Sequence, residues 1–295
     1  MPKITCFGEV LWDVFPTHRK IGGAPLNVAN RLKALDNEVT MVTAIGKDKK
    51  GREIKRYLQD CGIDVNCVQA HNEYKTGKVK VMLNGKGMAS YDIKYPRAWD
   101  KITLTEVNKA AVKESDAFVF GSLVARDDIS KDTLYQLVEL AKYKIFDLNL
   151  RIPYYTKDRL LYLMGKADFI KFNDEELYKV GKMMGSKYKA LEQNLQFVAK
   201  QTNTRHVCVT KGEHGAVLLY NGNLYYNSGY LIHVVDTVGA GDSFLGVLIS
   251  ELLKGVAPQK AIDFACAVGA LVAQNEGANP KLSLDEINTF INPDL

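Results

Sequence analysis

Short runs of apolar residues alternate along the chain with longer stretches in which apolar residues recur every three or four positions. The short runs, which we expect to be buried strands, are residues 4–7, 40–44, 117–120, 144–146, 169–172 and 206–210. The longer stretches, which we expect to be helices, are residues 27–35, 52–61, 106–114, 133–143, 175–184 and 191–201. This alternation is typical of a parallel sheet covered by helices on both faces. The pattern therefore predicts an α/β fold with a mostly parallel sheet between helices.

Two predicted hairpins interrupt this pattern. Residues 77–83 and 89–95 flank a glycine-containing turn at residues 85–87 and alternate as a half-exposed strand pair should. We expect this hairpin, extended to about residues 77–99 and joined by about residues 12–22, to form a small β lid. Residues 216–220 and 224–227 meet at an Asn-Gly turn. This second hairpin is predicted to widen one edge of the main sheet.

The last part of the chain is predicted to be helical, over residues 242–254, 258–274 and 283–290. Small residues dominate the middle helix, which permits close packing on the sheet or on a flat ligand. No internal repeat or low-complexity linker occurs. We therefore expect residues 1–295 to form a single domain with the small lid attached.

Composition narrows the function. Hydrophobic residues make up 46% of the 295 residues and charged residues 25%, as in ordinary globular proteins. The 39 basic and 34 acidic residues are interspersed, so no basic stripe indicates a nucleic-acid partner. Five cysteines without a C-x-x-C pair predict buried thiols in a reducing compartment. The longest low-charge run, residues 238–253, is too short to span a bilayer, and the residues before the first predicted strand do not show a charged-then-apolar leader pattern. We expect a cytoplasmic protein without a membrane partner.

The strongest chemical signal is Asp-Thr-Val-Gly-Ala-Gly-Asp at residues 236–242, immediately before a predicted helix. Glycines at a helix start let several backbone N–H groups point at one spot, and the helix dipole adds partial positive charge there. Gly239, Ala240 and Gly241 are thus a candidate anion hole, with Asp242 beside it as a candidate base. A glycine turn with an acidic first-turn residue that only stabilises the helix is the alternative.

A second glycine block opens the first predicted helix. Gly22 and Gly23 allow close approach of the backbone to a ligand, and Asn27 offers both a donor and an acceptor. Upstream, Glu9 and Asp13 follow the first strand, where ligands bind in open α/β sheets. Loop and capping roles for Asp13 and Asn27 are the alternative.

Two further strand ends carry polar residues. Asn173 and Glu176 follow the strand at residues 169–172, and oxygen ligands of this kind can hold water around Mg²⁺ and a phosphate. The same spacing fits a capping box at the start of the next helix. Asp147, Asn149 and Arg151 follow the strand at residues 144–146. Arg151 is a candidate partner for a phosphate or for a carboxylate.

Taken in order, these motifs resemble those of the ribokinase family of sugar kinases, the PfkB group. The similarity extends over essentially the whole chain and includes Thr210-Lys211-Gly212 with Gly215. It implies a ribokinase-like, Rossmann-type sandwich of a mostly parallel sheet between helices, with a small β lid over the sugar, and it implies that ATP and Mg²⁺ are required.

The resemblance also implies roles for individual residues. Asp242 would take the proton of the acceptor hydroxyl, next to the anion hole of Gly239, Ala240 and Gly241. The implied sugar contacts are Asp13, Gly22, Gly23 and Asn27. The implied ATP contacts are Asn173, Thr210, Lys211, Gly212, Gly215, Cys266 and Asn275. Glu176 would organise Mg²⁺ through water.

Within the family, the Gly-Gly-Ala-Pro-x-Asn-Val-Ala block and the Asp-x-Asn-x-Arg strand end are most similar to those of fructokinases. The second motif also occurs in 2-keto-3-deoxygluconate kinases, so the acceptor is open between these sugars. Arg97 and Arg151 are the candidates for substrate discrimination. Asp236 resembles one ligand of a monovalent cation, but Lys281 stands where relatives often have a second, a serine. This departure argues against K⁺ dependence.

The prediction is therefore an ATP-dependent sugar kinase, with fructose as the expected acceptor. A 2-keto-3-deoxygluconate kinase, or another sugar or nucleoside kinase of the same family, is the alternative. The chain has no G-x-x-x-x-G-K-[ST] phosphate loop and no H-R-D catalytic loop. A catalytically silent sugar or nucleotide sensor is the alternative from another class, although a pure binder needs no base at Asp242. Because a short β lid leaves an exposed edge, a homodimer through the lid is also expected.

Overall fold

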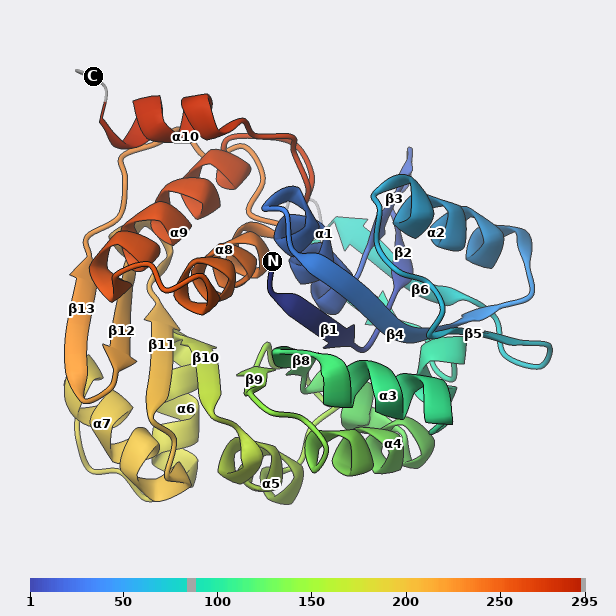
Figure 1. The fold of residues 1–295 in the computed structure, drawn as a ribbon, viewed down its shortest axis with the longest axis horizontal. Helices are drawn as coiled ribbons and strands as arrows, with labels where there is room; N and C mark the ends of the chain where they lie inside the picture. Colours follow the sequence, from blue (N-terminus) through green and yellow to red (C-terminus); the bar gives the residue numbers. More distant parts are fainter. Residues whose placement is uncertain (84–88, 293–295) are drawn as a thin grey trace.

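The computed structural model describes residues 1–83 and 89–292. The turn predicted at residues 85–87 lies outside the described residues. Within the described chain, two sheets and ten α-helices form the fold (Figure 1). The helices are α1 (Ala24–Ala34), α2 (Lys49–Asp60), α3 (Glu106–Glu114), α4 (Asp128–Val138), α5 (Lys157–Lys166), α6 (Asp174–Met183), α7 (Leu191–Thr202), α8 (Ala240–Leu253), α9 (Pro258–Ala273) and α10 (Leu284–Ile291).

The larger sheet has nine described strands in the order β13-β12-β11-β10-β9-β8-β1-β4-β5. Its strands are β1 (Lys3–Phe7), β4 (Glu38–Gly46), β5 (Val68–His71), β8 (Ala117–Gly121), β9 (Lys144–Asp147), β10 (Phe169–Asn173), β11 (His206–Thr210), β12 (Ala216–Tyr220) and β13 (Asn223–Asn227). All neighbours pair in parallel except β11–β12 and β12–β13, which are antiparallel. The predicted second hairpin therefore widens the sheet edge, as expected.

Alternate residues of each central strand pack against two different sets of helices, one on each face of the larger sheet. In β8, Phe118 and Phe120 pack with α3–α7, whereas Ala117 and Val119 pack with α1, α2 and α8–α10. Successive side chains of a strand point to opposite faces, so both faces of a parallel sheet are buried. The two hydrophobic clusters are the two interfaces of a three-layer α/β/α sandwich (Figure 1). The predicted fold class is confirmed.

The smaller sheet has four described strands, β3 (Arg19–Gly22), β2 (Leu11–Val14), β6 (Gly77–Leu83) and β7 (Ala89–Ile93), in that order. β2 pairs with β6 in parallel and with β3 antiparallel. Both segments expected in the lid therefore contribute to this small sheet. Whether it closes over a ligand stays a prediction.

Several boundaries differ from the predictions. α4 begins at Asp128, five residues before the predicted helix, because the Asp127 side chain accepts from Ile129 N (3.0 Å) and caps it there. α5, capped by Thr156, was not predicted, and neither was strand β5 beside β4. The described cysteines are all free thiols, and four of the five are buried. Among the described residues, no helix is long and apolar enough to cross a membrane.

Candidate active site

The register of the central strands brings polar side chains into one row. Asp147 at the end of β9 faces Gly121 of β8 on one side and Lys171 of β10 on the other. Lys171 Nζ lies 3.0 Å from Asp147 Oδ1, and both side chains are more than 90% buried. Asp147 Oδ2 has no hydrogen-bond partner among the described residues. A buried carboxylate oxygen without a partner is costly, so this row is the first place to look for chemistry.

The Asp236–Asp242 segment contacts this row of polar side chains at Lys171. Gly239 has φ +79°, a left-handed conformation that favours glycine, and it precedes the first residue of α8. A β-carbon on Gly241 would lie 3.4 Å from Lys171 Nζ. The first amides of α8 and the Lys171 ammonium therefore lie close together, and both attract an anion.

Asp242 stands in the first turn of α8 and is half-buried. Its Oδ2 accepts a 2.8 Å hydrogen bond from Asn27 Nδ2, although the two residues are 215 positions apart. Asn27 Oδ1 in turn accepts from Asn279 Nδ2 at 2.9 Å. The structure thus brings the two glycine blocks together and adds Asn279, which the sequence analysis missed because only the folded chain places the α9–α10 loop there.

Burial sets the protonation of this carboxylate. Desolvation and the nearby charge of Asp147 raise the pKa of Asp242 to about 6, while Lys171, the Asn27 hydrogen bond and Arg151 act in the opposite direction. Burial also raises the pKa of Asp13 to about 6, opposed by Arg151. A pKa near 6 leaves Asp242 mostly ionised at neutral pH and more basic than an exposed aspartate, as suits a general base.

Glu9 is a second buried acid that the sequence analysis quoted without giving it a role. It is 5% exposed, and its Oε2 has no partner among the described residues. Desolvation raises its pKa to about 7, against the opposing influence of its backbone hydrogen bond and of Arg151. Glu9 and Asp147 line the same small cavity under the start of α1. The acceptor side of the site is therefore rich in carboxylates.

Gly23, immediately before α1, lies where only glycine fits. Its φ is +120°, and a β-carbon there would lie 2.4 Å from Glu9 O. Asp13 Oδ2 comes similarly close to Gly22, at 2.6 Å from the place of a β-carbon. The predicted sugar contacts Asp13, Gly22 and Gly23 therefore pack against the loop that carries Glu9.

The two arginines expected to discriminate substrates lie differently. Arg151 is exposed, and its charge lowers the pKa values of Glu9, Asp13 and Asp242. Arg97 belongs to a basic cluster: after desolvation, Lys50, Lys80 and Arg97 lower the pKa of Lys78. Arg151 is thus grouped with the acids of the site and Arg97 with the lysines of the small sheet.

Asn173 and Glu176 form a full capping box at the start of α6. Glu176 N donates to Asn173 Oδ1 (2.7 Å), and Glu176 Oε2 accepts from Asn173 N (2.9 Å). Glu176 Oε1 accepts from Leu150 N at 2.7 Å. The capping alternative is therefore confirmed. It does not exclude a ligand role, because each carboxylate oxygen can accept a second hydrogen bond, for example from a metal-bound water.

A cavity of about 680 Å³ extends from this corner along α8 and α9. It is lined by Asn173, Thr210, Gly212, Glu213, His214, Gly215, Ser228, Gly229, Tyr230, Leu231, Ile232, Val234, Thr237, Ala240, Gly241, Phe244, Cys266, Gly269, Ala270 and Ala273. Most of the predicted nucleotide contacts are among these residues. Lys211 and Asn275 are not, and Asn275 Nδ2 donates to Leu271 O at 2.8 Å instead.

The loop at residues 228–237 is the part of this cavity that sequence analysis missed. Leu231 in this loop is fully exposed, and Tyr230 packs on Phe290 of α10. The one available signal was the apolar stretch Tyr-Leu-Ile between the second hairpin and the Asp236–Asp242 segment. Small residues of α9 form the opposite wall. The groove therefore suits a flat, partly apolar ligand.

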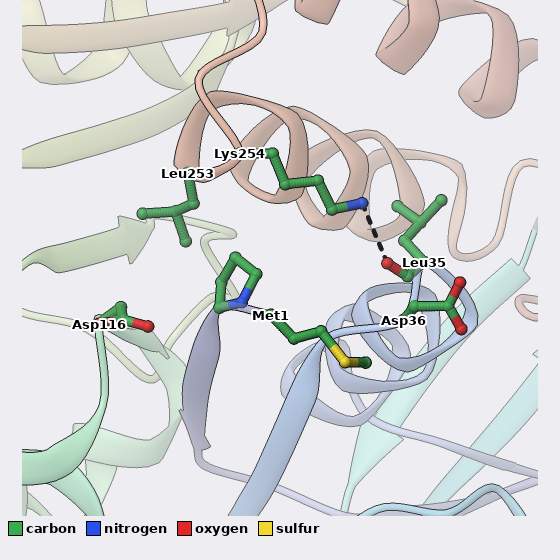
Figure 2. A pocket seen from close by; sticks show the side chains of 7 residues that line it. Met1, Leu35, Asp36, Asp116, Leu253 and Lys254 are labelled. Carbon is green, nitrogen blue, oxygen red and sulfur yellow. Dashed lines mark hydrogen bonds between the residues drawn. The ribbon is translucent and has the colours of Figure 1, made fainter.

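Another groove, of about 630 Å³, lies at the opposite end of the strands (Figure 2). It is lined by Met1, Pro2, Leu35, Asp36, Asp116, Leu253 and Lys254. Lys254 Nζ already donates to Leu35 O (3.0 Å), and Asp116 Oδ2 accepts from Lys3 N (2.8 Å). None of the predicted site residues is there. This groove and the cavity along α8 and α9 have similar volumes, but only the cavity along α8 and α9 is lined by predicted site residues.

Comparison with known proteins identifies the family. The model of the pfkB family carbohydrate kinases matches residues 2–284. The chain belongs to the pfkB family. A probable fructokinase-3 of Arabidopsis thaliana is 26% identical to this kinase over 313 residues, with 96% of this chain and 89% of the relative covered.

Solved structures agree with the fold. A fructokinase from Vibrio cholerae O395, with fructose, ADP and calcium bound, is 25% identical to this pfkB-family kinase, with 99% of each chain covered and a TM-score of 0.84. A putative ribokinase II from E. coli, in complex with ATP and Mg²⁺, is 22% identical, with 99% and 100% covered and a TM-score of 0.88. The chain is thus a carbohydrate kinase of the pfkB family with the ribokinase-like fold.

Proposed function

We propose that this kinase transfers the γ-phosphoryl group of Mg·ATP to a hydroxyl of fructose, giving fructose 6-phosphate. The observation that carries the proposal is the 2.8 Å hydrogen bond between Asn27 and Asp242. It joins the proposed sugar-binding block to the proposed base at the start of α8. The fructokinase relatives, at 26% and 25% identity, favour fructose among the family's acceptors.

In the proposed reaction, Asp13, Gly22, Gly23 and Asn27 hold the sugar, and Asp242 Oδ1 or Oδ2 receives the hydroxyl proton. The sugar oxygen forms a bond to the γ-phosphorus, and the bond to the β-phosphate bridging oxygen breaks, so ADP leaves with the electron pair. Asn279 orients the Asn27 amide. The amides of Gly239, Ala240 and Gly241, with Lys171, stabilise the charge that develops on the phosphoryl oxygens.

The nucleotide is proposed to occupy the 680 Å³ groove, with its phosphates toward α8. Thr210, Lys211, Gly212, Gly215, Cys266 and Asn275 are the proposed contacts, together with Asn173 and the residue 228–237 loop.

Mg²⁺ fits this corner through water. The described residues contain no group of three or more His, Cys, Asp or Glu side chains that could hold a metal. Mg²⁺ commonly keeps several waters and is held by one or two carboxylates plus substrate phosphates. The carboxylate of Glu176 and Asp147 Oδ2, which has no partner among the described residues, are the groups that we propose to hold the metal-bound waters. When bound, Mg²⁺ would neutralise phosphate charge.

A monovalent cation at Asp236 remains a weaker prediction. Asp236 Oδ1 accepts from Val238 N and Oδ2 from Gly277 N, both at 3.0 Å. These bonds join the anion-hole loop to the α9–α10 loop without a cation. Lys281 is exposed, and its charge acts on the Cys61 thiol.

A 2-keto-3-deoxygluconate kinase is the second candidate. The observation in its favour is the exposed Arg151, whose charge acts on Asp13 and Asp242. An anionic acceptor needs such a cation nearby. Lid closure by the small sheet, which would exclude water, belongs to both candidates.

The test is a coupled ADP-release assay with Mg·ATP against fructose, ribose, 2-keto-3-deoxygluconate, nucleosides and fructose phosphates. We expect the highest kcat/KM with fructose. Preference for the keto-acid would transfer the assignment to the second candidate. Binding of sugar and nucleotide by calorimetry without turnover would instead support a silent sensor.

The homodimer through the small sheet is also a proposal. β3 and β7 are the edges of that sheet among its described strands, and unpaired edges favour association. A monomeric mass by light scattering at assay concentration would refute it.

A further inference from the structure

Lys20 lies in β3 on the face of the small sheet that carries a proposed sugar contact. It pairs with Asp13 across the antiparallel β2–β3 register. Residues opposite each other in such a pair project from the same face. Asp13 Oδ2 also lies over Gly22, two positions from Lys20 on β3. Lys20, Asp13 and Gly22 therefore share one face.

From this face the Lys20 side chain reaches the loop between α9 and α10. A β-carbon on Gly277 would lie 3.4 Å from Lys20 Nζ and 3.6 Å from its Cδ. In Figure 1 the red chain after α9 runs down toward α1 and the small sheet, in agreement with this contact. Lys20 thus connects the small sheet to the α9–α10 loop.

The same loop touches the reaction centre at two points. Ala278 packs against Gly239, since a β-carbon on Gly239 would lie 2.4 Å from Ala278 Cβ. Asn279 donates to Asn27, which donates to Asp242. The Lys20 ammonium therefore ends beside the loop that packs on the anion hole and orients the partner of the base.

The charge of Lys20 is uncompensated. Within residues 1–83 and 89–292 it forms no ion pair within 4.0 Å, whereas its neighbour Arg19 pairs with Glu53 at 3.2 Å. Arg19 projects from the other face, where its guanidinium lies 4.5 Å over the Trp12 ring. Two adjacent cations of one strand thus have different surroundings: Arg19 is already satisfied, and Lys20 is available to an anion.

We propose that Lys20 contacts the γ-phosphoryl group of the bound nucleotide, opposite the α8 amides, and stabilises it during transfer. This inference rests on the proposed kinase function. The phosphoryl group in transfer spreads its charge over three equatorial oxygens, so cations on two sides stabilise it better than one. Lys20 forms no covalent bond; the proton still goes to Asp242 and the leaving electrons to ADP.

The test compares a ligand that has a γ-phosphate with one that lacks it. Calorimetry with Mg²⁺ gives Kd for ADP and for a non-hydrolysable imido analogue of ATP, in wild type, Lys20→Met, Lys20→Arg and the control Arg19→Met. We expect Lys20→Met to weaken the analogue about tenfold and to leave ADP within about twofold, because one phosphate contact is lost. Lys20→Arg should retain most of the affinity, and Arg19→Met should change neither ligand.

Equal weakening of both ligands in Lys20→Met would mean that Lys20 only latches the small sheet, and would overturn the proposal. Unchanged affinity for both ligands, or a wild type that does not bind the analogue, would overturn it too. Since these measurements need no acceptor, failure of the kinase proposal is separable. A wild type with Lys20-dependent analogue binding that phosphorylates no sugar would refute the acceptor assignment while supporting the phosphate contact.

Discussion

Arg126–Asp100 and Lys171–Asp147 are two buried ion pairs that differ at the carboxylate: both oxygens of Asp100 have a partner, although Arg126 Nη1 has none among the described residues, whereas only one oxygen of Asp147 does. Arg126 Nε and Nη2 meet the two oxygens of Asp100 at 2.7 and 2.9 Å, and the guanidinium lies 4.1 Å over the Trp99 ring. Lys171 meets Asp147 through one oxygen, and the other has no partner among the described residues.

The difference indicates different roles. A bidentate pair held between aromatic rings is rigid, so we assign the Arg126–Asp100 pair a structural role in stabilising the fold next to the small sheet. A single contact that leaves a buried carboxylate oxygen unsatisfied stores unfavourable free energy that a ligand can relieve. Burial lowers the pKa of Lys171, but Asp147, Glu176 and Asp242 outweigh it and raise that pKa, so the lysine remains charged beside the anion hole.

The largest effect should come from Asp242, the carboxylate close to the Lys171–Asp147 pair. Asp242→Asn should lower kcat by about 10³- to 10⁴-fold, because the general base is lost, while analogue binding persists. In wild type, kcat/KM should rise with pH through about 6, where Asp242 ionises. The coupled assay measures both, with Asp285→Asn, in the first turn of α10, as the control. A variant with more than a tenth of wild-type kcat would refute the base assignment.

Disruption of the bidentate Arg126–Asp100 pair should affect folding instead. Arg126→Met leaves Asp100 fully buried and without its main partner, so we expect a loss of about 3–5 kcal/mol in the free energy of unfolding. Urea denaturation measures it, and Arg159→Met, on a half-exposed arginine nearby, should cost far less. The kcat per folded molecule should stay within a few-fold of wild type. A large loss of kcat with unchanged stability would reverse the roles assigned to the two pairs.

Lys171→Met tests whether the Lys171–Asp147 pair contributes to catalysis or only to stability. Removal of the cation beside Gly241 should lower kcat about 10²-fold, because one stabilising charge near the transferred phosphoryl group is lost. Asp147→Asn added to it should recover stability, since no unpaired charge remains at that pair, but should not recover kcat. Recovery of turnover in the double variant, measured by ADP release, would show that the pair is only structural.

The smallest effect concerns Glu9, the other acid of this corner. Its folded pKa is raised from 4.5 to about 7, so its contribution to stability is present below pH about 4.5 and is lost as pH rises through about 7. Glu9→Gln, neutral throughout, should therefore be more stable than wild type at pH 8, by on the order of 2 kcal/mol, and nearly equal at pH 5. Urea denaturation at both pH values tests this, with the exposed Glu106→Gln as control. The same change at both pH values would contradict it.

Much of the fold was predictable because local patterns decide it. The apolar runs of β1, β8 and β10 and the period of α8 and α9 are strong signals that tertiary contacts do not override. The start of α4 was missed because the Asp127 cap, rather than the apolar period, decides it. β2 and β3 escaped strand prediction because neither is a continuous apolar run and both are paired only within the small sheet.

The site was predictable where the chemistry is contiguous in sequence, as at Gly239–Asp242 and Gly22–Asn27. It was not predictable where it depends on contacts across the fold. Asn279 and Lys171 carry no local signature, and the residue 228–237 loop has only a short apolar stretch. Their places depend on strand register and on how α9 packs. The single Asp147–Lys171 contact likewise follows from the alignment of β9 with β10.

In the proposed reaction, the γ-phosphoryl group is transferred to a sugar hydroxyl rather than to water. ³¹P NMR of the wild type with Mg·ATP and fructose tests it most directly, because it identifies the bond that forms. We expect the ATP signals to give way to those of ADP and one sugar phosphate ester, with little inorganic phosphate. Inorganic phosphate as the main product, with fructose and with every other sugar tried, would contradict the account, and so would ATP that is not consumed.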